Sequence, residues 1–233
     1  MKKTLTLILA TVLSTNIFAQ LKAGLKLSGT FALNSVTDNS GPTDSINYDN
    51  SSIGLRYSAG LNLDFHINKS VAFGTGLWFT VKRAGFTSSY ILNNAGYDVN
   101  EVYNLQYLQI PLTLKMFTNN IADDMKLYFQ LGPSLDIKIN EKLLSNNPGS
   151  KPMYTAAHNE DRAVFSYFDC SIIAGAGVEW QMAENTALFG GLSYNRSLIN
   201  TFNPYLQWPN GTYVNADITN KTSSISIDLG VKF

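Results

Sequence analysis

The sequence predicts an all-β fold, an eight-stranded antiparallel up-and-down transmembrane β-barrel. Three observations lead to this fold class. Apolar and polar residues alternate in long runs, the links between the runs are alternately short and long, and the chain ends on an amphipathic run that stops at Phe233. The alternation has the two-residue period of a β-strand. Long runs with one apolar and one polar face are typical of strands that cross a bilayer at a tilt.

The segment from Ile53 to Ile67 carries the clearest alternation. Its odd positions are all apolar or aromatic, and its even positions are Gly, Ser, Asn, Arg56, Asp64 and His66. The run is much longer than the usual globular strand of about 5–6 residues. One face therefore suits hydrocarbon, and the other suits a polar lumen.

The same parity, followed along the chain, gives eight strands and alternating links. The strands are Leu21–Leu33, Ile53–Ile67, Val71–Val81, Leu105–Met116, Lys126–Ile139, Ala163–Met182, Ala187–Ser197 and Ser223–Phe233. The links Asn68–Ser70, Phe117–Met125 and Ala183–Thr186 are short, whereas the other four span roughly twenty residues each, as in outer-membrane barrels with short periplasmic turns and long outer loops. An even number of strands then places both chain ends in the periplasm.

Outward aromatic residues support this arrangement, because they fall into two girdles at the expected membrane interfaces. The periplasmic girdle contains Phe65, Phe73, Phe129, Trp180 and Phe233, and the outer girdle contains Phe31, Tyr57, Phe79, Phe168 and Tyr194. The alternative is a water-soluble, lipocalin-like barrel with its apolar faces inside. Its polar faces would be rich in Lys, Glu and Thr, whereas here they are mostly Gly, Ser and Asn with isolated charges.

The chain ends indicate export to the outer membrane. Lys2, Lys3 and the short apolar run up to Phe18 predict a signal peptide over residues 1–19, which leaves a barrel domain over residues 20–233. The last strand ends on Phe233, and we expect the barrel-assembly machinery to recognise it there. The other expected contact of the barrel wall is outer-membrane lipid.

Three residues interrupt the regular pattern. Pro111 and Pro133 fall inside strands, where each removes a ladder hydrogen bond and predicts a bulge or bend. Cys170, the only cysteine, lies at an outward position, which favours a small lipid-facing residue over redox chemistry.

Three segments resemble the PorT-like outer-membrane β-barrel family. They are Tyr107-Leu-Gln-Ile-Pro-Leu-Thr-Leu-Lys115, Phe129-Gln-Leu-Gly-Pro-Ser-Leu135 and Ala174-Gly-Ala-Gly-Val-Glu-Trp180. The resemblance covers essentially the whole mature chain and implies a small envelope barrel of OmpA/OmpX-type architecture. It implies a link with protein export, which is associated with PorT itself. It assigns no functional residue, because the matched segments form strands.

Inward positions carry the clearest polar constellation. An eight-stranded barrel is just wide enough to be filled by its side chains, so charges there are expected to pair. Lys26 and Asp228 should pair across the first and last strands. We expect salt bridges that plug the lumen, with a narrow ion channel as the alternative. The predicted lumen charges are Lys22, Lys26, Arg56, Asp64, Lys82, Lys115, Asp136, Lys138, Glu179, Asp228 and Lys232.

Catalytic chemistry has few candidates. His66 shares a face with Asp64, as a hydrogen-bonded lumen residue would, and His158 lies close to Glu160 and Asp161 in a long loop. The alternative function is therefore an enzyme that acts on lipid or peptide at the outer rim through His158. The same three loop residues are a weak metal set, since spacing alone does not fix geometry. We expect no catalytic site, metal or cofactor.

The long loops are the best candidates for recognition. The fourth contains Phe202, Tyr205, Trp208 and Tyr213, aromatic residues that either contact a protein or glycan partner or fold the loops onto each other. The formal net charge is zero, so no basic field favours nucleic acid. The sequence thus predicts a non-enzymatic envelope protein with structural or interaction roles.

Overall fold

The computed structural model describes residues 21–38, 46–50, 54–92, 95–145, 164–202, 205–207, 213–215 and 218–233. The predicted signal peptide lies outside these ranges. Within them, no helix is long and apolar enough to cross a membrane.

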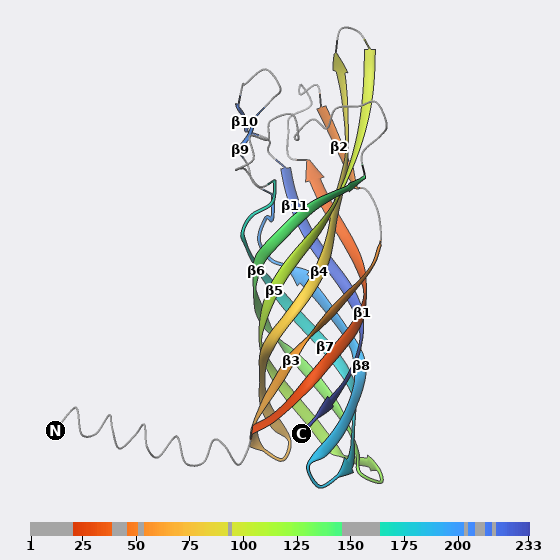
Figure 1. The fold of residues 1–233 in the computed structure, drawn as a ribbon, viewed down its shortest axis with the longest axis vertical. Coiled ribbons are helices and arrows are strands. Elements are labelled where there is room, and N and C mark those ends of the chain that lie inside the picture. The colour runs from red at the N-terminus through yellow and green to blue at the C-terminus, as the bar shows by residue number, and fades with distance from the viewer. Residues whose placement is uncertain are drawn as a thin grey trace, which may run out of the picture.

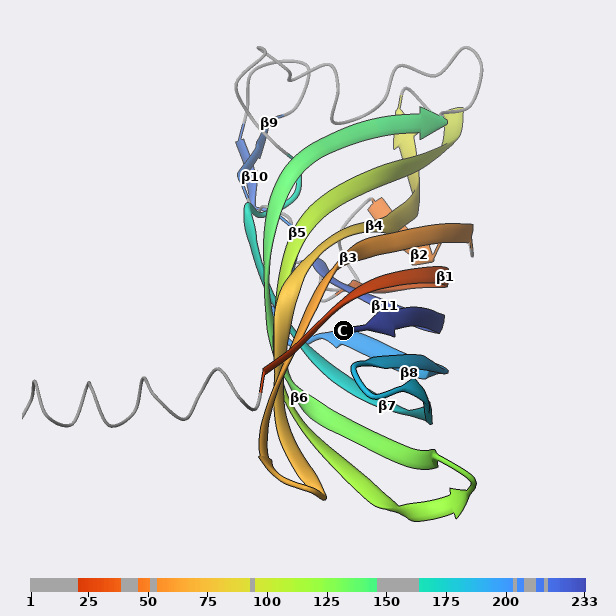
Figure 2. The same ribbon diagram turned by 60° about the horizontal axis from the view of Figure 1, so that its bottom comes forward.

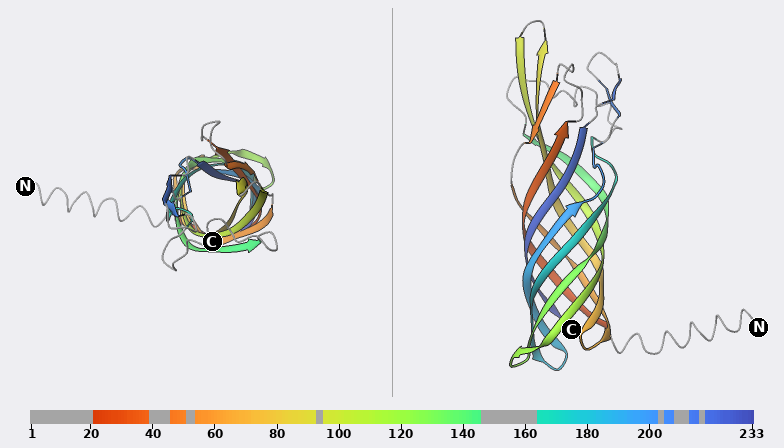
Figure 3. Two further views of the ribbon diagram at one scale, coloured as in Figure 1. Left: turned by 90° about the horizontal axis from the view of Figure 1, so that it is seen from above. Right: turned by 180° about the vertical axis from the view of Figure 1, so that it is seen from behind.

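Eight antiparallel strands close into a barrel, which confirms the predicted fold class (Figure 1). Pairing of β4 with β5 and of β1 with β11 completes the circle, and the view along the barrel is round (Figure 3). The barrel strands are β1 (Leu21–Asp38), β3 (Gly54–Asn68), β4 (Val71–Leu92), β5 (Ala95–Ala122), β6 (Met125–Ser145), β7 (Phe168–Ala183), β8 (Thr186–Ser197) and β11 (Ile218–Lys232).

The two ends of the barrel differ. At one end, here called the turn end, tight turns join β3 to β4, β5 to β6 and β7 to β8, and the C-terminus lies beside them (Figure 2). At the other, the loop end, β2 (Ile46–Asn50) pairs with β4, and β9 (Tyr205–Gln207) pairs with β10 (Tyr213–Asn215). Phe233 follows β11, and its backbone N–H donates to the carbonyl of Ala23 at 2.7 Å, which secures the chain end to β1.

Burial along the strands is reversed relative to a water-soluble protein. Outward apolar side chains such as Leu27 and Leu61 are more than half exposed, at 61% and 54%, whereas inward Asp64, Ser134 and Asp136 are buried. Such a surface requires an apolar solvent, because exposing so much apolar area to water is unfavourable. The water-soluble alternative is therefore wrong.

Several strands are longer than the sequence pattern indicated. We expected the third strand to end at Val81 and the fourth to begin at Leu105, yet β4 and β5 pair continuously to Leu92 and Ala95. Beyond the membrane the outer face no longer meets lipid, so apolar alternation stops while backbone pairing continues. For the same reason β1, β6 and β11 extend past their predicted ends at the loop end.

Two other predicted boundaries are wrong. The expected turn Phe117–Met125 is mostly strand, because β5 runs to Ala122 and the turn is completed by Asp124 with φ 57°. The sixth strand begins at Phe168 rather than Ala163, and the segment Val164–Tyr167 instead folds inward at the loop end, as described below.

The two prolines mark gaps in the ladder rather than bulges. The β4–β5 pairing skips from Thr75↔Leu112 to Trp78↔Gln109, around Pro111, and the β5–β6 pairing skips from Pro111↔Ser134 to Leu114↔Leu131, across from Pro133. The register is unchanged on either side of each gap. Proline has no N–H to donate to the ladder, so pairing is interrupted near each proline while the register is kept and no bulge forms.

Candidate functional site: a charged lumen closed at the loop end

The inward charges lie in layers along the barrel axis. Nine of the eleven predicted residues are buried and take part in ion pairs. Lys22 is partly exposed at the turn end, with 34% of its side chain accessible. Arg56 is also partly exposed, donates to the carbonyl of Leu55 at 2.7 Å, and has no ion pair with any described carboxylate.

The layer nearest the turn end is built around one carboxylate. Asp64 on β3 receives the ammonium of Lys115 at 2.7 Å and that of Lys232 at 2.6 Å. Lys232 also contacts Glu179 on β7, and Lys22 lies 3.6 Å from the same carboxylate. The chain of charges thus joins five strands across the lumen, and three lysines share two acids.

A single pair occupies the middle layer. The ammonium of Lys26 lies 3.2 Å from Asp228, so the pair expected from closure of the first and last strands is present. Ser28 donates a hydrogen bond of 2.6 Å to the same carboxylate. Lys26 also lies over the ring of Trp78, 3.6 Å from its centroid, in cation–π geometry.

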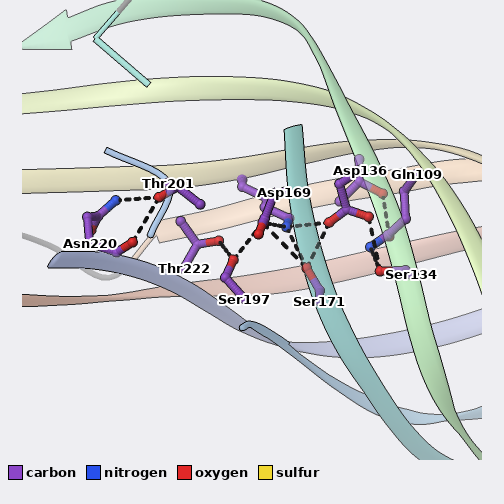
Figure 4. Close-up of polar contacts among 11 residues, drawn as sticks. Gln109, Ser134, Asp136, Asp169, Ser171, Ser197, Thr201, Asn220 and Thr222 are labelled. Carbon is purple, nitrogen blue, oxygen red and sulfur yellow. Dashed lines mark hydrogen bonds and ion pairs between the residues drawn. The ribbon is translucent and has the colours of Figure 1, made fainter. Parts of the chain in front are cut away.

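The layer on the loop side is built around one lysine. Lys82 on β4 reaches Asp136 at 2.6 Å and Asp169 at 2.8 Å. Hydroxyl groups add hydrogen bonds to these carboxylates: Ser171 donates to Asp136 at 2.9 Å, and Ser197 donates to Asp169 at 2.6 Å, while the other oxygen of Asp169 is buried without a hydrogen bond. Figure 4 shows these side chains converging from β6, β7 and β8, together with Gln109, Ser134 and Thr222.

Aromatic rings and a further ion pair close the loop end of the lumen. Phe165 is fully buried and packs edge-to-face on Tyr103 of β5 and on Phe202, with ring centroids 5.3 and 5.8 Å apart. The ammonium of Lys138 donates to the carbonyl of Phe165 and pairs with Glu141 at 2.5 Å. Because Lys138 and Tyr103 point into the barrel, Phe165 lies inside its mouth.

Backbone hydrogen bonds hold this closure, which we call the mouth segment (residues 164–167 with 198–202). The N–H of Ser166 donates to Thr201 at 2.7 Å, and that of Val164 donates to the carboxylate of Glu141 at 2.8 Å. Residues 164–167 are therefore held both by the distant residues 198–202 and by side chains of β6.

Sequence reasoning missed several of these residues for identifiable reasons. Asp169 lies at inward parity beside the outward Phe168, so the signal for it was present but unused. Glu141 and Glu101 lie beyond the predicted strands. Phe165 was counted in a strand, and nothing in its pattern indicates an inward fold.

Glu101, at the loop end of β5, is a buried acid outside the apolar band. The outward positions of β5 are polar at Asn104 and Gln106 and apolar from Leu108 to Met116, so Glu101 lies beyond the membrane-spanning part. The hydroxyl of Tyr103 donates to its carboxylate at 3.1 Å, while its other oxygen is buried without a hydrogen bond. Burial raises the pKa of Glu101 to about 7.

The other candidates have mixed outcomes. His66 does not bond Asp64: its ring lies beside Phe117, 5.5 Å between centroids, and its Nε2 is buried without a partner. His158, Glu160, Asp161 and Trp208 lie outside the described residues. Tyr205 and Tyr213 lie in the β9–β10 hairpin, and Phe202 is buried in the mouth. No cluster of three or more metal-ligating side chains occurs in the described part of the chain.

Together, the closed sheet, apolar wall and polar lumen define an integral outer-membrane barrel. The family model for the outer membrane protein beta-barrel domain matches residues 18–203. The chain belongs to this family, and its location is the outer membrane. No curated protein sequence matches the chain.

Solved structures with similar folds have diverse names. Neisserial surface protein A is 11% identical, with 91% of this chain and 96% of that chain covered and a TM-score of 0.47. OprG from Pseudomonas aeruginosa is 12% identical, with 91% and 95% covered and a TM-score of 0.43. The outer membrane protease OmpT from Escherichia coli is 12% identical, with 91% and 96% covered and a TM-score of 0.41.

Proposed function

We propose that this protein is a non-enzymatic, non-conducting outer-membrane barrel that acts through its loop end. The observation that carries the proposal is the filled lumen: three layers of paired charges lie beneath a mouth segment in which Phe165 is fully buried. A barrel filled by its own side chains leaves no continuous water path. The surface of the loops is therefore proposed as the site of contact with a macromolecular partner.

The proposed orientation places the turn end and both chain ends in the periplasm. It is supported by the difference between tight turns at one end and long connections at the other, the usual asymmetry of outer-membrane barrels. The β4–β5 and β9–β10 hairpins then project from the cell surface (Figure 1). Protease added outside intact cells should cut the protein within its loops and leave a tag at its C-terminus uncut.

The proposed partner is a protein or surface glycan that contacts the loops, above all the fourth loop. Tyr213 pairs with Gln207 and Tyr205 pairs with Asn215, so both tyrosines belong to a short strand pair at the loop end. Phe202 is excluded from the contact set, because it is buried in the mouth. The PorT-like resemblance extends the proposal to export machinery as the partner.

Photo-crosslinking in living cells tests the partner. A crosslinking amino acid at position 205 or 208 should give a protein or glycan adduct, whereas the same residue at Lys126, on the turn end, should not give that adduct. Equal yields of the adduct from the loop end and the turn end, or no adduct from any loop position, would contradict the proposal.

The enzymatic alternative is tested separately. If His158 is catalytic, His158→Ala should abolish hydrolysis of lipid or peptide while the barrel still folds. We expect instead that His158→Ala keeps both the fold and the crosslinked adduct, and that replacing Tyr205 and Trp208 with alanine removes the adduct.

Planar-bilayer recording tests the closed lumen. The purified protein should show no stable single-channel steps. The Phe165→Gly/Phe202→Gly variant removes the aromatic closure but keeps the charge layers, so we expect it to stay closed as well. Single-channel conductance steps in this variant alone would place the barrier to ions at the mouth segment. Conductance steps in the unmodified protein would overturn the proposal.

A further inference from the structure

A cup opens at the turn end of the barrel. Its volume is about 520 Å³, within the range of small-molecule sites, and its lining includes Lys22, His66, Lys69, Phe117, Lys126 and Gln181. Above it lies a cluster of buried apolar side chains, formed by Ala72, Phe117, Tyr128 and Phe189. Phe117 belongs both to this cluster and to the lining of the cup, so the cup borders an apolar cluster.

The cup has more positive than negative charge to offer a ligand. Glu179, in its lining, is already engaged by Lys232 and Lys22. Lys69 and Lys126 also line the cup and have no ion pair with any described carboxylate. The remaining acid in the lining is Asp124, in the turn before β6, so two lysines without ion pairs stand against one such acid.

The inner wall of the cup offers an aromatic surface. The rings of His66 and Phe117, which both line the cup, lie against each other with 5.5 Å between their centroids. Gln181 is held by the carbonyl of Ala183 at 2.7 Å, which fixes the opposite wall.

We infer that this cup binds the anionic end of a small amphiphilic molecule, a carboxylate or phosphate monoester with an attached apolar group. The lysines at the rim attract the anion, and the aromatic wall formed by His66 and Phe117 receives the apolar part. In the proposed orientation the ligand comes from the periplasm, but binding itself does not depend on that orientation or on the loop partner.

Nuclear magnetic resonance of the His66 ring tests this inference. His66 and His158 are the two histidines, so a His158→Gln background leaves one ring signal to follow in detergent micelles at constant pH. Phenyl phosphate and benzoate are the probes, inorganic phosphate lacks the apolar part, and benzyl alcohol lacks the charge. We expect a saturable shift with at least one of the first two, and affinity at least about tenfold weaker for phosphate.

Matched variants assign the binding to the cup. Lys69→Gln/Lys126→Gln should weaken the better probe by about tenfold or more, since both charges lie at the rim. Lys142→Gln/Lys221→Gln makes the same charge change at the loop end and should leave binding unchanged. No saturable shift, equal binding of benzyl alcohol or phosphate, or equal losses in the two double variants would overturn the inference.

Discussion

The turn-end and loop-side charge layers are built on opposite plans. Near the turn end one carboxylate, Asp64, holds the ammonium groups of Lys115 and Lys232. On the loop side one ammonium, Lys82, holds the carboxylates of Asp136 and Asp169. A narrow lumen can thus be filled around a central charge of either sign, provided that this charge links side chains from several strands. The central residue of each layer should therefore matter more than its neighbours.

The largest expected effect comes from removing either central charge. Asp64→Asn leaves two lysines, and Lys82→Met leaves two aspartates, without their shared partner. Breaking a buried ion pair in this way costs about 3–5 kcal/mol. Urea unfolding of the protein in detergent should show both losses, with smaller ones for Lys115→Met and Asp136→Asn. Equal losses for central and flanking residues would contradict the comparison.

The middle pair is expected to show a slightly smaller effect. Asp228→Ala strands the ammonium of Lys26, which keeps its contact with Trp78, so we expect a loss of about 3 kcal/mol. The Lys26→Met/Asp228→Leu double variant removes both charges and should recover most of the stability. If Asp228→Ala and the double variant unfold like the unmodified protein, the pair contributes nothing.

The buried carboxyl group of Glu101, at the loop end, should make the stability of the folded protein depend on pH. Its pKa of about 7 in the folded protein lies above the ordinary value near 4.5, so the folded state binds more protons between these values. Stability should therefore be full below about pH 4.5 and fall as pH rises to 7, by about 3 kcal/mol in total, and then level off. Chemical unfolding between pH 5 and 8 should show this decline, and Glu101→Gln should reduce it. A slope that is the same in Glu101→Gln would assign the decline to other groups.

The sequence predicted the layers only in part. A period of two places Lys26, Asp64 and Asp228 inside, and adjacency of the first and last strands pairs Lys26 with Asp228. The link from Lys82 to Asp136 and Asp169 crosses the lumen between strands that are not neighbours in the sheet. Such contacts depend on strand tilt and stagger, which alternation does not encode.

The loop end was harder to predict for a related reason. Apolar alternation ends where the wall leaves the membrane, so the continuation of β4 and β5 had no periodic signal. The mouth segment depends on contacts of Phe165 with Tyr103 and Phe202, which come from three distant parts of the chain. Local patterns carry no information about such contacts.

The smallest predicted effect concerns the hydroxyl groups of the acid-rich layer. Asp136 and Asp169 share one lysine, so donors such as Ser197 must supply part of the missing positive charge, whereas Asp228 has a lysine of its own beside Ser28. Ser197→Ala should therefore cost about 1.5–2 kcal/mol, at the low end of the range for hydrogen bonds to charged groups, and Ser28→Ala about 1 kcal/mol or less. Ser193→Ala, a buried inward serine on the same strand β8, is the control. If Ser28→Ala lowers the free energy of unfolding in urea more than Ser197→Ala does, hydroxyl groups do not compensate for the missing cation in the layer around Lys82.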